Sequence, residues 1–190
     1  MRTGWALSSK FGSYLSTQRY SPGPNSEYCG EAALILCNLF IRRRFLGSIP
    51  FPENFICCEE SWLLQEIWEK GGKLRYVPEL YVYHHRRSTL ESLFKQVFKY
   101  GEGRGQMSVR RKDLIRWPHI VPSLSVLFGA ILLLQGSWNL FFFYGILCLI
   151  FAHRTVPEKE RDIQNVVGTA TIFPVVHVAY GLGFMKGLWR

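Results

Sequence analysis

Apolar residues dominate the last third of the chain. After Arg116 no Asp, Glu, Lys or Arg occurs until Arg154, and the residues Gln-Gly-Ser at 135–137 divide this uncharged stretch. Such polar and small residues are typical of a turn between regular elements. The pattern therefore predicts two short apolar helices, at 118–134 and 138–152, which form a hairpin.

A third uncharged run covers 163–185 and contains 23 residues. A membrane-spanning helix needs about 20 apolar residues, so this run is long enough to cross a bilayer alone, with a span at about 166–185. Pro174, His177 and several glycines predict a kink, or a helix that lies partly in the membrane interface. Together the runs predict about three transmembrane helices in a membrane region at 118–190. The alternative is that they are buried helices of a soluble protein.

Before this region, apolar and charged residues are interleaved as in a water-soluble fold. The segment 1–31 is rich in Ser, Gly and Pro and lacks a period, so we expect it to be irregular. Ser88 and Glu91 form a capping box in front of a helix with one apolar face. In order, the pattern predicts a strand at 32–41, a helix at 59–70, strands at 73–77 and 80–83, and a helix at 89–100.

The charge balance points to a negatively charged partner. The sequence has 23 Lys and Arg against 14 Asp and Glu, a net charge of +9, yet only 19% of its residues are charged. Soluble domains average about 25% charged residues, so the composition excludes a disordered chain. Anionic lipid or a phosphorylated substrate fits the positive sign. A nucleic acid does not, because the basic run at 86–116 abuts an apolar run and no nucleic-acid-binding motif accompanies it.

The distribution of basic residues predicts an orientation in the membrane. Nine basic and three acidic residues occupy 86–116, and three more basic residues lie in the loop 153–165. Basic loops remain on the cytosolic side. We therefore expect an integral protein of the cell inner membrane, with the soluble part and the loop 153–165 in the cytosol and 135–137 outside.

The five cysteines show neither a CxxC pair nor Cys/His spacing of the zinc-binding kind. Their number is odd and two of them, Cys57 and Cys58, are adjacent. This usage is typical of reduced thiols in the cytosol rather than of a disulfide framework.

Three segments in a fixed order carry a family resemblance: CNLFIRR at 37–43, EESWLLQEIWEKGGKLRYVPELYVYHH at 59–85, and LFKQVFKYGEGRGQM at 93–107. They resemble family 2 glycosyltransferases, which are inverting enzymes with a GT-A fold. The C-terminal residues HVAYGLGFMKGL resemble the ends of membrane-bound members that build exopolysaccharides. The resemblance implies an α/β fold, with 32–117 as the acceptor-side half of a GT-A domain, followed by the membrane helices.

The resemblance assigns the acid pair Glu59–Glu60 to catalysis. An inverting transfer needs one carboxylate near the acceptor hydroxyl to take its proton. Glu60 aligns with the Asp of the family and is the candidate base, with Glu59 beside it. Glutamate in place of aspartate is a departure, because the extra methylene shifts the carboxylate by about 1 Å. The alternative is that both acids merely favour a helix N-terminus.

A second group of candidates follows the spacing of the Gln-x-x-Arg-Trp motif of processive synthases in the same superfamily. By that resemblance Gln96 opens the motif, Tyr100 is a stacking platform for the acceptor sugar, and Lys99 and Arg104 contact the donor diphosphate. Lysine in place of arginine loses bidentate geometry. The alternative is an amphipathic helix whose basic side meets lipid headgroups.

His84 and His85 end the second predicted strand of the Val-Pro pair. Adjacent residues of a strand point to opposite faces, so the two rings are poorly placed to bind one metal together. The resemblance implies that one of them contacts the diphosphate or its metal. The alternative is a pair of histidines on the membrane-proximal surface.

The donor site of the family is missing from the sequence. A GT-A enzyme carries a nucleotide-binding half with an Asp-x-Asp turn for Mg²⁺ or Mn²⁺, but the two aspartates here are isolated, at Asp113 and Asp162. The sequence thus predicts no metal or other cofactor in this chain. It predicts a fragment of a membrane-bound glycosyltransferase, inactive alone, whose intact form moves a sugar from a nucleotide sugar to a lipid-linked or polysaccharide acceptor. The alternative is a non-catalytic membrane protein whose basic juxtamembrane region binds anionic lipid or a partner synthase.

Overall fold

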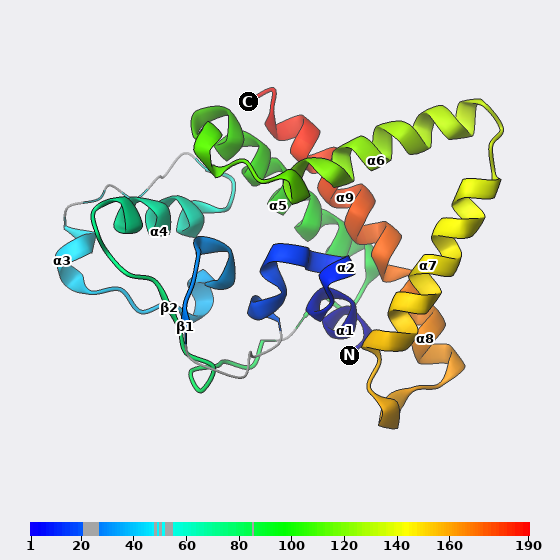
Figure 1. Ribbon diagram of the computed structural model, residues 1–190, viewed down its shortest axis with the longest axis horizontal. Helices are drawn as coiled ribbons and strands as arrows, with labels where there is room; N and C mark the ends of the chain where they lie inside the picture. Colours follow the sequence, from blue (N-terminus) through cyan, green and yellow to red (C-terminus); the bar gives the residue numbers. More distant parts are fainter. Residues whose placement is uncertain (21–26, 48, 50, 52–54, 85) are drawn as a thin grey trace.

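The computed structural model describes residues 1–20, 27–47, 49, 51, 55–84 and 86–190. Most of them are helical (Figure 1). The α-helices are α1 (Arg2–Ser8), α2 (Lys10–Ser13), α3 (Arg43–Leu46), α4 (Glu59–Glu69), α5 (Leu90–Arg110), α6 (Trp117–Leu134), α7 (Asn139–Thr155), α8 (Ile163–Ala170) and α9 (Ile172–Gly187). The 3-10 helices are η1 (Tyr14–Arg19), η2 (Glu31–Ala33), η3 (Leu36–Asn38), η4 (Lys112–Leu114) and η5 (Glu158–Glu160).

The predicted α/β GT-A fold is wrong. In the described residues the β structure consists of two short antiparallel strands, β1 (Glu27–Tyr28) and β2 (Arg75–Tyr76). The predicted strand at 32–41 forms η2 and η3 instead, and Phe40 within it is exposed. An apolar run of this length does not identify a strand by itself. A strand needs a neighbour for its backbone groups, and this segment has none in the described part of the chain.

Two of the predicted helices are confirmed. The helix at 59–70 is confirmed as α4, and the helix at 89–100 is confirmed as the first half of α5, which continues to Arg110. The cap lies one residue later than predicted, because Thr89 rather than Ser88 accepts the hydrogen bond from the backbone N–H of Ser92. Helices also occur in the segment expected to be irregular, as α1 and α2.

All three apolar runs form helices. The first two are α6 and α7, and the third is broken at Thr171 into α8 and α9. Among the described residues, two stretches are long and apolar enough to cross a membrane: α6, with a mean hydropathy of 1.8, and Ile163–Gly187, with 1.5. Only 11% of α6 is buried within the protein, so its apolar surface is available to lipid.

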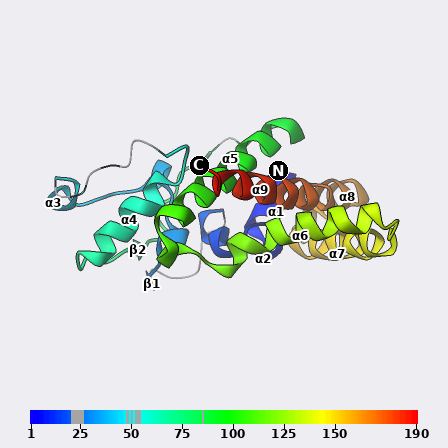
Figure 2. The same cartoon turned by 90° about the horizontal axis from the view of Figure 1, so that it is seen from above.

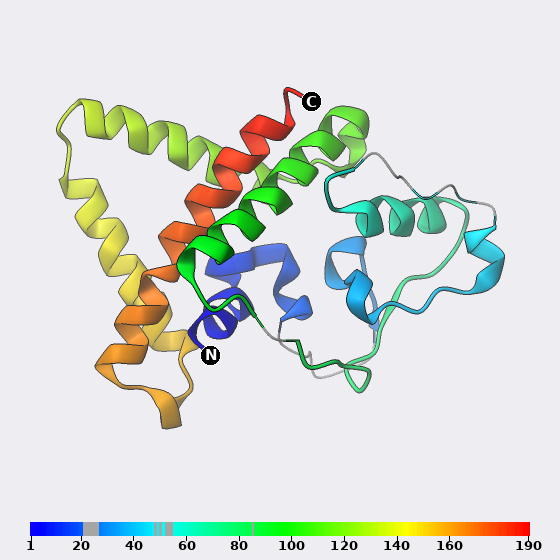
Figure 3. The same ribbon diagram turned by 180° about the vertical axis from the view of Figure 1, so that it is seen from behind.

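Helices α5 and α9 lie side by side at the centre of the molecule (Figure 1). On one side of them are α3, α4 and the strand pair, and on the other are α6, α7 and α8 (Figure 2). Helices α6 and α7 diverge from the turn that joins them instead of packing as a hairpin, and α1 and α2 lie next to α8 and α9 (Figure 3).

Glycines allow α5 and α9 to touch backbone to backbone. A Cβ atom added to Gly101 would lie 2.2 Å from the carbonyl oxygen of Tyr180, and one added to Gly183 would lie 2.0 Å from that of Phe98. Gly105 and Gly187 continue the contact one turn further along. The two helices therefore run parallel through facing Gly-x-x-x-Gly pairs, an arrangement common between helices in membranes.

Two hydrophobic cores flank the space between α4 and α5. The larger core joins α5 to α1, α7 and α9, and it contains Leu93, Val97 and Phe173. The apolar face of α5 thus packs on α9, not on α6, the first predicted span. The smaller core lies under α4 and contains Leu63, Leu64 and Ile67. The candidate residues lie between these cores.

The N-terminal segment is attached to α9 by a half-buried histidine. His177 Nε2 lies 2.7 Å from the carbonyl oxygen of Phe11, and Nδ1 lies 2.7 Å from the hydroxyl oxygen of Tyr144. A carbonyl oxygen only accepts, so Nε2 carries the proton and the tyrosine donates to Nδ1. This network attaches residue 11 to both α7 and α9.

Candidate functional site

The acid pair lies in the first turn of α4, where the helix dipole favours negative charge. Glu60 Oε1 accepts from Arg19 Nη1 at 3.3 Å, and each of these side chains is only 12% exposed. Glu59 Oε2 is buried and has no hydrogen-bond partner among the described residues. Glu60 is therefore held by an ion pair, whereas the buried Oε2 of Glu59 has no such partner among the described residues.

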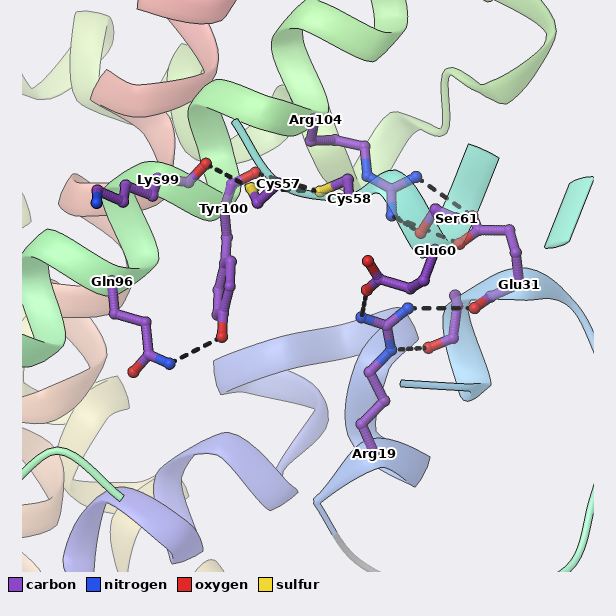
Figure 4. Close-up of polar contacts among 11 residues, drawn as sticks. Arg19, Glu31, Cys57, Cys58, Glu60, Ser61, Gln96, Lys99, Tyr100 and Arg104 are labelled. Carbon is purple, nitrogen blue, oxygen red and sulfur yellow. Dashed lines mark hydrogen bonds and ion pairs between the residues drawn. The ribbon is translucent and has the colours of Figure 1, made fainter. Parts of the chain in front are cut away.

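Arg19 reaches this position from the end of η1 (Figure 4). Its Nε donates to the carbonyl oxygen of Ala32 at 2.7 Å, and its Nη2 donates to that of Glu31 at 3.1 Å. One guanidinium thus joins η1 and η2 to the acid pair of α4. The sequence offered no signal for Arg19, because the segment around it has no periodic pattern.

A second ion pair lies beside the first and is buried more deeply. Arg104 of α5 donates to Glu31 Oε1 at 3.3 Å and to the Ser61 hydroxyl at 3.1 Å. Glu31 and Arg104 are 6% and 7% exposed. Burial by itself would raise the pKa of the Glu31 carboxyl, but the charges of Arg104 and Arg19 and the Ser61 hydrogen bond outweigh it and lower this pKa below its ordinary value.

Gln96 and Tyr100 lie together on α5. Gln96 Nε2 donates to the Tyr100 hydroxyl at 2.8 Å, and the tyrosine is 38% exposed. Burial of the ring and the nearby Tyr20 raise the pKa of Tyr100. Residues four apart lie on one face of a helix, which accounts for this pairing. The ring lies between Gln96 and the acid pair in the view of Figure 4.

Lys99 does not share this position. Its side chain is exposed and points away from Arg104 (Figure 4). Its carbonyl oxygen instead accepts from Cys57 Sγ at 2.9 Å. The two residues proposed as diphosphate contacts therefore differ: Arg104 is buried in an ion pair, while the ammonium group of Lys99 faces solvent.

The histidines are not part of this cluster. His84 is exposed in the segment between β2 and α5, and no hydrogen bond joins it to the acid pair in the described part of the chain. His85 lies outside the described residues, so its predicted role stays a prediction. No group of three or more His, Cys, Asp or Glu side chains that could hold a metal ion occurs among the described residues. The Mg²⁺ or Mn²⁺ that the resemblance implies has no ligand set there.

We define the polar cluster as Arg19, Glu31, Glu60, Ser61 and Arg104. In this cluster an ion pair holds the carboxylate of Glu60, and the partly exposed ring of Tyr100 lies nearby. Sequence reasoning missed Arg19, Glu31 and Ser61, whose roles depend on contacts between distant segments. Glu31 follows Cys29 and Gly30 directly, and nothing in that local sequence distinguishes a buried acid from an exposed one.

No protein-family model, curated protein or solved structure matches this chain. The family resemblance therefore rests on the residues quoted for it, and the activity it implies stays a prediction.

Proposed function

We propose that this chain is the acceptor-side and membrane portion of a membrane-bound glycosyltransferase, in which Glu60 takes the proton of the acceptor hydroxyl. The observation that supports it is the convergence of the two candidate motifs. The acid pair of α4 and the Gln96–Tyr100 pair of α5 lie far apart in sequence. In the structure Glu60 belongs to the polar cluster, and Tyr100 lies beside that cluster (Figure 4). The proposal concerns the activity and not the α/β fold.

The polar cluster suits the role of a general base. The ion pair with Arg19 engages Glu60 Oε1, which leaves Oε2 to accept the proton. The Tyr100 ring is the platform for the acceptor sugar. Arg104 is a positioning residue, because it binds Ser61 next to Glu60 and so sets the distance between α4 and α5. Donor and metal are assigned to a part of the enzyme outside these residues, as the resemblance implies.

Acceptor binding tests this function in the chain itself. We would incubate the protein in nanodiscs with a photoreactive polyprenyl-diphosphate monosaccharide and map the crosslinks. Crosslinks should fall on α5 near Tyr100, and Tyr100→Ala should reduce them at least about tenfold, because it removes a stacking surface. The matched control is Tyr81→Ala, which alters an exposed tyrosine elsewhere. An unchanged yield of crosslinks in the Tyr100→Ala variant would contradict the proposal.

Catalysis tests the role of Glu60. In an enzyme that also carries a donor-binding half, Glu60→Gln should lower kcat by about 100-fold or more, because the amide takes no proton. Glu60→Asp should retain activity, since it restores the residue of the family motif. Glu79→Gln changes an exposed acid and serves as the control. Equal activity of Glu60→Gln and the control would reject Glu60 as the base.

We also propose that α9 lies along the cytosolic membrane interface. Near the start of the third apolar run, Asn165 accepts from Arg2 at 3.0 Å. Near its end, Lys186 pairs with Glu102 of α5 at 2.8 Å. Both ends thus contact segments that the basic residues assign to the cytosol. The turn 135–137 would then mark the far side of the membrane, and the C-terminus would return to the cytosolic side.

Cysteine labelling distinguishes this arrangement from three spans. In a variant without the native cysteines, an impermeant maleimide added to whole cells should label Ser137→Cys but neither Lys159→Cys nor Trp189→Cys. Trp189 is 91% exposed, so its protection would reflect the membrane and not burial. External labelling of Trp189→Cys would show instead that α9 crosses the bilayer.

A second candidate function is supported by the surface at the start of α6. Lys112 and Arg116 are exposed next to Trp117, whose ring is also exposed. Tryptophan and basic residues are typical of the cytosolic membrane interface. This surface fits a non-catalytic membrane protein that binds anionic lipid. Vesicles with and without phosphatidylglycerol test it: a Lys112→Gln, Arg116→Gln variant should lose the preference for anionic vesicles while acceptor crosslinking persists.

A further inference from the structure

Two adjacent cysteines form the turn that leads into α4. The Sγ atoms of Cys57 and Cys58 are 3.8 Å apart. A disulfide bond measures about 2.05 Å. The two sulfur atoms would therefore have to move about 1.8 Å closer together to form one. The backbone of Cys58 is in the left-handed region, with φ of 71°. Non-glycine residues adopt this conformation rarely, and here it brings two neighbouring side chains to the same side of the chain.

Both thiols connect α4 to α5. Cys57 Sγ donates to the carbonyl oxygen of Lys99 at 2.9 Å, and Cys58 Sγ to that of Tyr100 at 3.8 Å. The turn lies directly on α5, since a Cβ atom added to Gly103 would lie 2.4 Å from Cys57 Sγ. Any change in the covalent state of the thiols must therefore alter the contact between the two helices.

The two thiols also differ chemically. Once Cys58 is ionised, the neighbouring S–H of Cys57 and the charge of Arg104 stabilise its thiolate, which lowers the pKa of Cys58. The same contact with Cys58, together with burial, raises the pKa of Cys57. A thiol with a lowered pKa is the better attacking group near neutral pH. Both residues are half-buried, which leaves them within reach of a small reagent.

We propose that Cys57 and Cys58 are a reversible redox site, which closes to a vicinal disulfide by exchange with a low-molecular-weight disulfide of the glutathione class. Closure removes the two S–H donors that hold the start of α4 against α5. This inference stands on the thiol geometry alone and does not rest on the proposed function.

The exchange proceeds in two balanced steps. The Cys58 thiolate attacks one sulfur of oxidised glutathione, whose S–S bond breaks as one glutathione thiolate leaves. Cys57 then loses its proton to solvent and attacks Cys58 Sγ, and the second glutathione thiolate leaves. The protein dithiol is oxidised to a disulfide, and one molecule of oxidised glutathione is reduced to two thiols.

The bond formed is expected to be reversible. Adjacent Cα atoms are about 3.8 Å apart, whereas disulfide-bonded cysteines usually have Cα atoms about 4.4–6.8 Å apart. The ring between neighbours is therefore strained, and strained disulfides are reduced easily. Such labile disulfides occur in the cytosol as redox sensors, the compartment that the basic residues predict for this segment.

The test uses a full chain in which the other three cysteines are replaced by Cys29→Ser, Cys37→Ser and Cys148→Ala. After treatment with oxidised glutathione, intact mass spectrometry should show the loss of two hydrogens, with no glutathione adduct and no covalent dimer. Reduced glutathione in excess should restore the mass. A stable adduct without ring closure, or a covalent dimer, would overturn the proposal.

Single substitutions test the order of the steps and the consequence for α5. Cys57→Ser keeps a donor for Lys99 and should accumulate the adduct on Cys58, whereas Cys58→Ser should react at least about tenfold more slowly. Ring closure should also speed amide hydrogen exchange in residues 99–104, while the region around α7 serves as the internal control. Closure with unchanged exchange in α5 would refute the proposed coupling of the redox site to that helix.

Discussion

The two faces of α5 are both buried, but by different means. Toward α9 the contact is made mainly by glycines and apolar side chains, with close backbone contact at Gly101 and Gly183, and one buried acid, Glu102, pairs with Lys186 near its end. Toward α4 it is made by the polar cluster, in which Arg104 meets Glu31 and Ser61, and by the thiols of Cys57 and Cys58. One helix thus connects a closely packed apolar interface to a polar one.

The difference shows which property each face depends on. A backbone contact depends on volume, because close-packed interiors leave no room for an added side chain. A buried ion pair depends on charge balance, because a single unpaired charge in the interior is costly. Side-chain size should therefore matter most on the α9 face, and charge should matter most on the α4 face.

The largest effect is expected on the α9 face. Gly183→Leu should destabilise the protein by more than about 5 kcal/mol, in the exceptional range for single substitutions, because even its Cβ would lie 2.0 Å from the carbonyl oxygen of Phe98. Thermal unfolding in detergent measures the loss. Gly145→Leu is the control, since a Cβ there has no atom of another segment within 4 Å. Similar melting temperatures for both variants would disprove the close contact.

A somewhat smaller effect is expected when the buried pair is broken. Arg104→Met should cost about 3–5 kcal/mol, because it leaves the Glu31 carboxylate buried without its partner. The combined variant Glu31→Leu, Arg104→Met should recover much of the loss, since no charge is left uncompensated. Chemical unfolding of the single and double variants gives the coupling energy. Additive losses would mean that the two side chains act independently.

Acid should weaken the α4 face through Glu31. The pKa of Glu31 is lowered below its ordinary value of 4.5, so its ion pair contributes stability above that pH, and this contribution disappears as the pH falls through the folded-state pKa. The melting temperature should therefore drop on acidification, and Glu31→Gln should reduce the drop. Glu91→Gln, on the exposed surface of α5, is the control. An identical pH profile for Glu31→Gln and the unaltered protein would contradict the assignment.

The smallest effect is expected at the exposed edge of α5. Lys95 and Glu91 form an ion pair four residues apart, with both side chains largely in solvent. Such pairs contribute only about 0.3–0.5 kcal/mol, so Lys95→Ala should change the free energy of unfolding by no more than about 0.5 kcal/mol. Chemical unfolding at low and high salt measures it. A loss as large as that of Arg104→Met would remove the distinction between buried and exposed pairs.

The sequence by itself determined α4, α6, α7 and the first half of α5. Both ends of α4 were predicted, from the acid pair before Trp62 and from the glycines at 71 and 72. The ends of α6 and α7 were predicted within a few residues from the uncharged runs. These signals are local, since a helix satisfies its backbone groups within its own segment. A strand cannot satisfy its backbone groups within its own segment, because they bond to a neighbouring strand. The apolar run 32–41 needed a neighbouring strand to become one, and the fold provides none in its described residues.

Only the tertiary structure decided which residues form the polar cluster and how α5 is used. Arg19 meets Glu60 across 41 positions, and Arg104 meets Glu31 across 73. No period or spacing encodes such pairs, because they arise from the packing of separate elements. The glycines of α5 and α9 are visible in the sequence, but their facing alignment depends on two helices meeting in parallel. Local sequence therefore determined the elements, and long-range packing determined the candidate site.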